Sequence, residues 1–312
     1  MRTMVTRRPE TAAYAPAAHA ARAVGFVAAV VWLLMPPMAR AQLPEPGLLA
    51  RRYELGARLH YHMEGTNQGR ERLQRYQADA DGSVGRDTLG RFVEEFEWSH
   101  LVANDTAVVL PAGTAAVRQR LTLAPEYMIP ANMRATSPAL VGPVLDMLNF
   151  YIDLWVAAKL PLARPGDHVH VAGRGSNSWA DGRRLLIGED AIDFDFTLTA
   201  VDTAAGVARV TVRHVPPDSS RVRLPAEWMR VPAYGLPNNW VQVARESDSS
   251  WVASVGRESF DVVLTVDLHD GRLLAAEMDN PVDVLERRCT DAALSACGEA
   301  RRYRILRRIV LH

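Results

Sequence analysis

Cysteine, lysine and recognisable catalytic motifs are scarce in this chain of 312 residues. Cys289 and Cys297 are the only cysteines, too few to build a metal cage by themselves. Lys159 is the only lysine, so the remaining basic residues are arginines, which indicates a coding bias rather than a phosphate-binding surface. The sequence has no nucleophile elbow, Walker loop, HExxH motif or glycine-rich dinucleotide fingerprint. It therefore predicts no cofactor and favours a non-enzymatic function.

The N-terminal region has the three parts of a secretory signal. Several arginines precede the twelve-residue apolar run Val24–Met35, and Ala39-Arg40-Ala41 follows it as a small-x-small cleavage site. A membrane span needs about 20 apolar residues, so this run is too short to be one. We expect residues 1–41 to be removed after Ala41 and the mature chain to be periplasmic or secreted. No cysteine follows the cleavage site, so we expect no lipid anchor there.

The charge of the chain argues against a nucleic-acid partner. The whole sequence has 36 basic and 36 acidic residues, and residues 1–41 hold five of the arginines but one glutamate. The mature chain is therefore mildly acidic, without the basic surface that binds nucleic acid.

Period-2 alternation of apolar and polar residues dominates the sequence after a leader at residues 42–57. Ile192, Phe194, Phe196 and Leu198, for example, alternate with aspartates and threonines. Such alternation predicts an antiparallel sheet with one dry face. We expect about eleven strands, with turns at Asp81-Gly82, Asp181-Gly182 and Asp270-Gly271. The expected strands cover residues 59–63, 72–80, 92–102, 116–123, 167–173, 192–198, 207–214, 240–245, 260–268, 272–278 and 303–311.

One segment has a helical pattern instead. Residues 139–160 are apolar in almost every direction, and Pro138 and Pro161 bracket them. Two aspartates near the middle make a membrane span costly, so we expect no transmembrane segment in the mature chain. A helix this apolar must be covered by protein. The sequence therefore predicts a mainly β protein, in which a curved antiparallel sheet, a half-barrel, wraps around one long apolar helix in a single domain over residues 58–312.

This order of elements, from about Leu59 to Leu311, resembles the periplasmic β half-barrels of the lipoprotein-localisation carriers (LolA/LolB-like). In that family a sheet curls around helices and encloses a lipid-binding cavity. The resemblance implies a hydrophobic ligand for this chain. This chain is longer, its main helix lies mid-chain, and no specific motif allows functional residues to be transferred.

Residues 216–256 predict an irregular insertion between strands. They combine several prolines with the aromatic residues Trp228, Tyr234, Trp240 and Trp251. A long irregular loop in a compact domain is often functional. The alternative is a loop held by ordinary aromatic packing.

Two histidine pairs and one acidic cluster are candidates for chemistry. His60/His62 and His168/His170 each place two imidazoles on one strand face, where they could bind a metal if the two strands were neighbours. Paired carboxylates cleave glycosides when suitably spaced, and Trp179 beside them could hold a sugar. The alternative in both cases is a polar, solvated strand face. The carboxylate candidates are Asp181, Glu189, Asp193 and Asp195.

Gly142, Asp146, Asn149 and Asp153 form a polar stripe on the predicted helix, facing either solvent or the inside of the sheet. If the stripe faces inward, its carboxylates are ligand-binding candidates. We favour a carrier for a hydrophobic or lipid-like ligand, and the other hypotheses are an envelope scaffold that binds a protein partner and a secreted glycan hydrolase or lyase. The candidate ligand-binding residues are Asp146, Asn149, Asp153, Trp179, Trp228 and Trp240.

The two cysteines predict a disulfide, because lone cysteines pair in an oxidising compartment. Asn280-Pro281 has the pattern of a helix start, yet a helix continuous to Cys297 would hold the cysteines about 12 Å apart. A disulfide tolerates about 7 Å between Cα atoms. We therefore expect a short helix that ends near Arg287 or Arg288, followed by a turn through residues 291–295.

Overall fold

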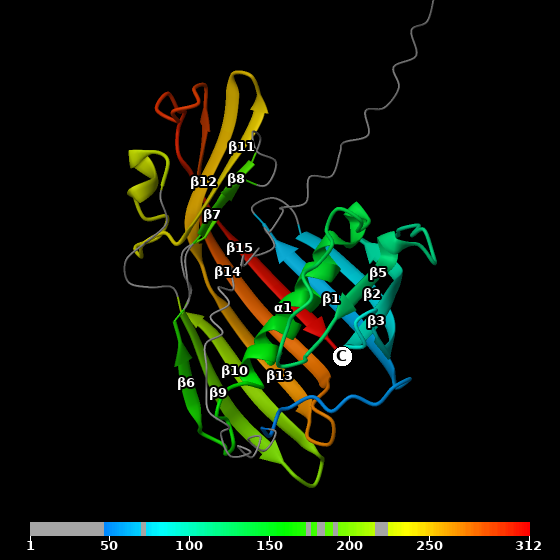
Figure 1. Cartoon of the computed structure of the whole chain (residues 1–312). Helices are drawn as coiled ribbons and strands as arrows, with labels where there is room; N and C mark the ends of the chain where they lie inside the picture. Colours follow the sequence, from blue (N-terminus) through cyan, green and yellow to red (C-terminus); the bar gives the residue numbers. More distant parts are fainter. Residues whose placement is uncertain (1–46, 70–72, 173–175, 180–184, 190–192, 216–223) are drawn as a thin grey trace, which may run out of the picture.

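A computed structural model describes residues 47–69, 73–172, 176–179, 185–189, 193–215 and 224–312. The predicted signal peptide, the first part of the leader and the Asp181-Gly182 turn lie outside these residues. The described chain forms one antiparallel sheet, not closed into a barrel, with the helix α1 (Val141–Ala157) across it (Figure 1). The predicted fold class is therefore confirmed.

Strands account for most elements. They are β1 (Arg58–Gln68), β2 (Leu73–Arg86), β3 (Phe92–Ala103), β4 (Thr106–Ala107), β5 (Arg118–Leu121), β6 (His168–Val171), β7 (Ser176–Trp179), β8 (Leu185–Glu189), β9 (Asp193–Asp202), β10 (Val207–Val215), β11 (Trp240–Ser247), β12 (Ser250–Glu258), β13 (Phe260–Asp267), β14 (Leu273–Cys289) and β15 (Arg301–Leu311). Short 3-10 helices are η1 (Ala115–Val117), η2 (Pro138–Leu140) and η3 (Glu227–Arg230).

The sheet divides at β14. On one side of β14 the order is β15, β1, β2 and β3, with β4 and β5 paired to opposite ends of β3. On the other side, the first half of β14 pairs with β13 and the second half with β12. The lower wing continues from β13 through β10 and β9 to β6, and the upper wing continues from β12 through β11 and β8 to β7 (Figure 1).

Pro281 lies at the point of division. β12 and β13 pair with β14 in one continuous register, in which Glu258 faces Val282 and Asp261 faces Asp279. Ser259, between the two strands, donates its backbone N–H to the Pro281 carbonyl. A proline has no N–H to offer a ladder, so it is tolerated where the ladder is interrupted.

A buried group of polar side chains replaces part of the ladder there. The amide of Asn239 donates to the Glu258 carbonyl and accepts from the Glu258 N–H, so it pairs as a strand residue would. The Asn280 amide donates to the Ser259 carbonyl and to the Glu258 carboxylate. These bonds satisfy the backbone where the two wings separate.

The main core lies between α1 and the inner face of the sheet, the face that α1 covers. Met147, Phe150, Tyr151 and Leu154 of the helix have no exposed surface. They belong to one cluster with apolar residues of β1–β3, β9, β10 and β13–β15. The predicted helix is therefore confirmed as the element around which the sheet is packed, and the apolar composition on most of its sides follows from that burial.

The predicted insertion at residues 216–256 contains regular structure. β11 and β12 form a hairpin in the upper wing, and η3 packs beside them. A second hydrophobic cluster holds this region together, built from Met229, Val241, Val255, Leu285 and their neighbours. The upper wing thus has a small core of its own.

The disulfide prediction is confirmed, but the helix predicted before it is wrong. Cys289 and Cys297 are bonded, with Cα atoms 3.9 Å apart. Residues 281–288 belong to strand β14, because β15 pairs with them up to Glu286 on one side and β12 pairs with them from Val282 on the other. The tertiary pairing overrides the local capping pattern of Asn280-Pro281. The expected turn is present, and the Asp291 carboxylate accepts backbone N–H groups of Ser295 and Ala296 within it.

The turn predicted at Asp81-Gly82 is also wrong. Asp81-Gly82 lies inside β2 rather than in a turn, since β2 pairs with β1 and β3 over its length. Gly82 is there for packing: a Cβ on it would lie 2.4 Å from the ring of Phe96 on the facing strand.

Candidate functional site

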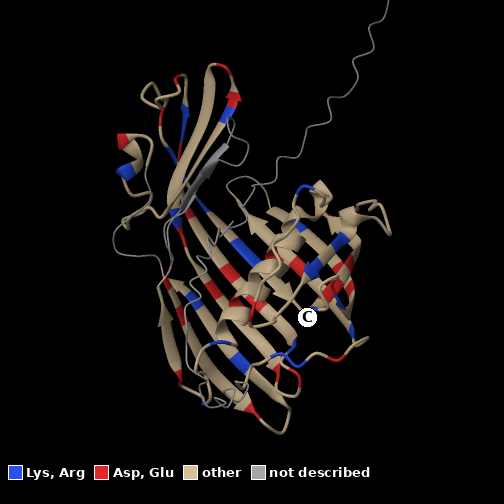
Figure 2. Cartoon of the chain, in the orientation of Figure 1, with Lys and Arg blue, Asp and Glu red and all other residues tan. Residues whose placement is uncertain are grey.

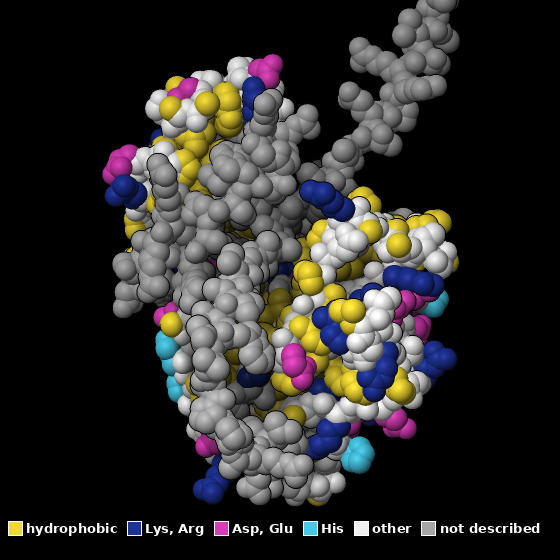
Figure 3. Space-filling view, viewed as in Figure 1, with side chains coloured by type: hydrophobic (Ala, Val, Ile, Leu, Met, Phe, Trp, Pro, Cys, Tyr) yellow, Lys and Arg dark blue, Asp and Glu magenta, His cyan; other side chains and the backbone are white. Residues whose placement is uncertain are grey.

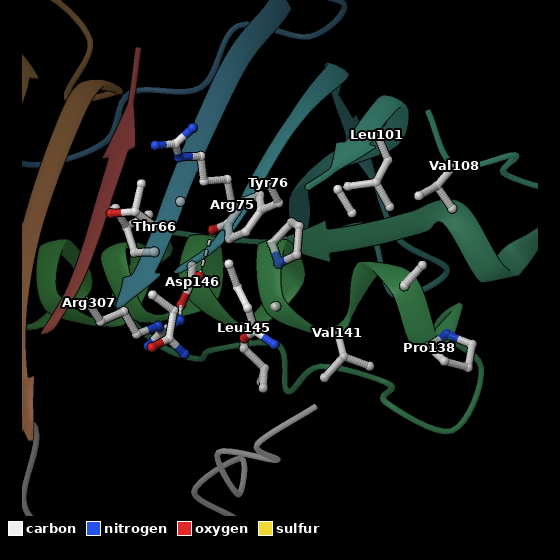
Figure 4. Close-up of a pocket in the computed structure, with 18 of the residues that line it drawn as sticks. Thr66, Arg75, Tyr76, Leu101, Val108, Pro138, Val141, Leu145, Asp146 and Arg307 are labelled. Atoms are coloured by element: carbon white, nitrogen blue, oxygen red, sulfur yellow. Dashed lines mark hydrogen bonds and ion pairs between the residues drawn. The ribbon is translucent and has the colours of Figure 1, made fainter. Parts of the chain in front are cut away.

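A pocket of about 430 Å³ lies between the first half of α1 and the inner face of β1, β2, β3 and β15 (Figure 4). This volume is in the range of small-molecule sites. Apolar side chains form most of its wall, from both the helix and the sheet. They are Leu101, Val108, Pro138, Val141, Pro143, Leu145 and Ile309.

Apolar side chains are also visible on the surface where α1 crosses the sheet (Figure 3). Basic and acidic residues are interspersed along the strands instead of forming a patch of one sign (Figure 2). Among the described residues in this view, no patch of one charge sign competes with this pocket as a binding site.

Tyr76 is placed in the pocket by a glycine on the neighbouring strand. Gly65 of β1 faces Tyr76 of β2, and a Cβ on Gly65 would lie 2.0 Å from the tyrosine ring. The ring can therefore lie flat on the β1 backbone, as in other cross-strand pairs of an aromatic residue with glycine. Its hydroxyl reaches the helix and donates to Asp146 Oδ2 at 2.7 Å.

The polar end of the pocket is built around Asp146. This carboxylate is fully buried and accepts hydrogen bonds from Tyr76 and from the guanidinium of Arg307 on β15 (Figure 4). Burial, and then the negative charge of Asp146, raise the pKa of Tyr76 well above its ordinary value, so its hydroxyl remains a donor. Burial alone would lower the pKa of Arg307, but the Asp146 carboxylate more than offsets this and raises it. The polar end of the pocket therefore holds an ion pair between Arg307 and Asp146.

The polar stripe of α1 has two environments. Gly142, Asp146 and Asn149 line the pocket, and Asn149 is solvent-exposed. Asp153 lies elsewhere in the interior, with Oδ1 3.5 Å from Nε2 of the buried His214. The rings of Phe194 and Phe260 flank this histidine at 4.4 and 4.6 Å. The stripe is thus inward-facing at both aspartates, but its last member, Asp153, does not line the pocket.

A buried network at the other side of the helix was not anticipated from the sequence. Glu94, only 1% exposed, accepts hydrogen bonds from Arg51 at 2.8 Å and from Tyr151 of α1. Arg51 also forms an ion pair with Asp270. Burial and the Glu94 charge raise the pKa of Tyr151 well above its ordinary value. Glu94 is fully partnered, so we assign this network to fixing the helix and the leader against the sheet.

The two histidine pairs lie on strands that are not neighbours, so they do not combine into one site. β1 pairs with β2 and β15, and β6 pairs with β9. Among the described residues, no group of three or more histidine, cysteine, aspartate or glutamate side chains is arranged to hold a metal ion.

Each pair instead faces aspartates across the ladder. His60 and His62 pair with Asp81 and Asp79, at 2.8 and 2.6 Å. In the lower wing, His170 Nδ1 lies 2.8 Å from Asp195 Oδ1, and this hydrogen bond raises the histidine pKa.

Two of the carboxylate candidates, Asp193 and Asp195, therefore lie beside a histidine pair with which no sequence pattern connects them. His170 Nε2 lies 3.4 Å from Asp193 Oδ2, and His168 Nε2 lies 3.5 Å from Asp195 Oδ1. Asp181 lies outside the described residues, as do the side chains of Glu189 and Trp179. Aspartates 193 and 195 do not line the pocket.

Trp228 and Trp240, the other aromatic candidates, belong to the upper wing and do not line this pocket. The indole N–H of Trp228 donates to the Leu294 carbonyl at 3.0 Å, and Arg287 lies over its ring. Trp228 therefore secures the disulfide-closed loop against η3.

Sequence reasoning missed Arg307 and Tyr76. Arg307 is 161 residues from Asp146 and lies among several arginines of β15, so nothing local distinguishes it. The one available signal was alternation, which places Arg307 on the same strand face as Ile309.

The sequence matches no protein-family model, and no curated protein matches it. Among the described residues, one helix, Pro138–Ala157, is long and apolar enough to cross a membrane. Yet 61% of its apolar window is buried in the protein, as in the core helix of a soluble fold.

Proposed function

We propose that this protein binds a hydrophobic, lipid-like small molecule in the pocket between α1 and the sheet. The observation that carries the proposal is the apolar wall of this 430 Å³ pocket, which has a small number of polar groups, among them Asp146 and Arg307, at one end. Ligand sites typically combine a large apolar lining with a small number of polar groups that orient the ligand. A carrier is also what the resemblance to the lipoprotein-localisation family implies.

To identify the ligand, the protein is purified from its own cell envelope. Bound lipids are then extracted from it with solvent, and the same sample is analysed by native mass spectrometry. We expect a copurified lipid-like molecule. The variant Ala139→Trp, which adds an indole at the pocket wall, should lose it because the site is filled. The matched variant Ala112→Trp, at an exposed position outside the lining, should retain it. A molecule retained by both variants, or no molecule in the native protein, would refute the proposal.

We further propose that the chain is exported and cleaved after Ala41. The disulfide supports this proposal, because structural disulfides persist in oxidising compartments such as the periplasm. N-terminal sequencing of the native protein should begin at Gln42. A mature protein that retains Val24–Met35 would contradict it.

A further inference from the structure

We infer that the ligand carries an uncharged polar group beside its apolar part, such as a hydroxyl, an ester or an amide. This inference rests on the proposed function, because it concerns the same pocket. It depends on the charges that the pocket presents and on their partners.

The two charged groups at the polar end of the pocket, Asp146 and Arg307, form an ion pair and cancel each other's charge. Asp146 is fully buried, and the side chain of its partner Arg307 is only 10% exposed. In such a position a charge is neutralised by its partner much more than by solvent. The guanidinium keeps further N–H donors besides the one that Asp146 accepts, since arginine has five. The pair therefore offers hydrogen bonds without offering a net charge.

Arg75 is the third charged residue of the lining, and it does not change this balance. It precedes Tyr76 on β2, and consecutive residues of a strand point to opposite faces. Its guanidinium accordingly extends away from Asp146 and Arg307 and is solvent-exposed (Figure 4).

The remaining polar groups of the lining are uncharged. Thr66 pairs with Arg75 across the ladder and shares its outer face, whereas Asn67, Gln74 and Asn149 supply amide groups, which both donate and accept. A neutral headgroup can exchange its hydrogen bonds with water for bonds to these groups. A carboxylate or an ammonium would lose hydration without meeting a free counter-charge, which is costly in an apolar pocket.

The test compares three ligands whose chains have twelve carbons: the glycerol monoester of lauric acid, laurate and dodecylammonium. Binding to the delipidated protein is measured by isothermal titration calorimetry. We expect the neutral ester to bind at least about tenfold more tightly than either ion. Equal or tighter binding of laurate or dodecylammonium would overturn the inference. Failure of all three to bind would instead contradict the proposed function.

Two variants test the charge balance directly. Asp146→Asn leaves Arg307 without its counter-charge, so laurate should gain about tenfold in affinity relative to the ester. Arg307→Gln leaves Asp146 uncompensated and should favour dodecylammonium in the same way. Asp153→Asn is the matched control: it removes a buried carboxylate from the same helix, but one that pairs with His214 outside the pocket, and the order of affinities should not change.

Circular dichroism establishes that each variant is folded before it is titrated. A folded Asp146→Asn or Arg307→Gln protein with the ligand preference of the native protein would overturn the inference. If neither variant folds, the comparison of the three ligands on the native protein decides.

Discussion

At the scale of single residues, two glycines of the sheet are required by rings on the neighbouring strand. Gly65 lies under Tyr76 and Gly82 under Phe96, and a Cβ on either glycine would overlap the ring. The position of Tyr76 over Gly65 lets its hydroxyl donate to Asp146, and the position of Phe96 over Gly82 lets its ring pack against Tyr61 in the core. These glycines therefore act through packing and not through unusual backbone angles, since neither has a positive φ.

Gly65→Ala should destabilise the protein by about 1–3 kcal/mol, because the added methyl displaces the Tyr76 ring. Ligand binding should weaken as well, since Tyr76 lines the pocket. Urea unfolding gives the stability, and calorimetric titration with the lauric ester gives the affinity. The control is Gly85→Ala in β2, where a Cβ would meet nothing within 4 Å. Equal unfolding midpoints for the two variants would contradict the packing argument.

His62 should make the stability depend on pH. Its hydrogen bond with Asp79 raises the histidine pKa above the ordinary 6.5. Hydrogen bonds from His62 and His100 outweigh the effect of burial and lower the pKa of Asp79 below 3.8. The stabilisation that the His62–Asp79 pair contributes is therefore complete between about pH 4 and 6.5. It is lost as the pH rises through the raised pKa of His62. Below pH 4 it is lost as the pH falls through the lowered pKa of Asp79.

We expect the free energy of unfolding to be larger at about pH 5.5 than at about pH 8.5, by no more than about 1 kcal/mol for this partly exposed pair. His62→Gln should reduce that difference, whereas His60→Gln, whose side chain is 63% exposed, should leave it nearly unchanged. A pH difference that His62→Gln does not affect would count against this assignment.

At the scale of elements, the sequence predicted correctly wherever a pattern was long. The helix over 139–160 and most strands have a sustained period, and burial on one face enforces it. Two errors arose at dipeptides, and a third is β12, Ser250–Glu258, which lies where the sequence predicted an irregular insertion. Asp81-Gly82 has the composition of a turn, but Gly82 accommodates Phe96. Asn280-Pro281 has the composition of a helix start, but Pro281 lies where the ladder is interrupted between β12 and β13.

About half of the polar end of the candidate site could be predicted. Asp146 and Asn149 were identified from one helical stripe, which is a local pattern. Tyr76 and Arg307 come from strands 70 and 161 residues away from Asp146, and their meeting depends on strand order. The pairing of His170 with Asp195 escaped prediction for the same reason.

Reduction of the disulfide should lower the free energy of unfolding by roughly 2.5 kcal/mol. The bond closes a loop between residues eight apart in the sequence, which restricts the unfolded chain. Reduced and oxidised protein are compared by urea unfolding. Ligand affinity should be unchanged, since neither cysteine lines the pocket. A large loss of affinity on reduction would show that the upper wing supports the pocket directly.

At the scale of the whole molecule, the division at β14 produces two hydrophobic cores in one sheet. The larger core surrounds α1, and the smaller one joins η3, the β11–β12 hairpin and the disulfide. Binding and the stability of the upper wing should therefore respond separately to mutation.

Met229→Ala and Met147→Ala form a matched pair, because both side chains are fully buried in different cores. Each substitution should lower the free energy of unfolding of the core in which it lies by about 2–5 kcal/mol. Hydrogen exchange should show faster opening of β11 and β12 in Met229→Ala, with ligand affinity preserved. In Met147→Ala affinity should fall, since this residue supports the helix that lines the pocket. Loss of affinity in both variants would mean that the two cores act as one unit.

The division at β14 also multiplies the places where the described sheet ends. An undivided open sheet has two borders, whereas here β4 and β5, β6, and β7 each pair on one side only within the described residues. Every border exposes unpaired backbone groups on which a second chain can add a strand. None of these four strands exceeds four residues, and β6 presents His168 and His170 there. Short, polar borders leave an incoming strand little to pair with, so the forked sheet is protected against self-association at each of its ends.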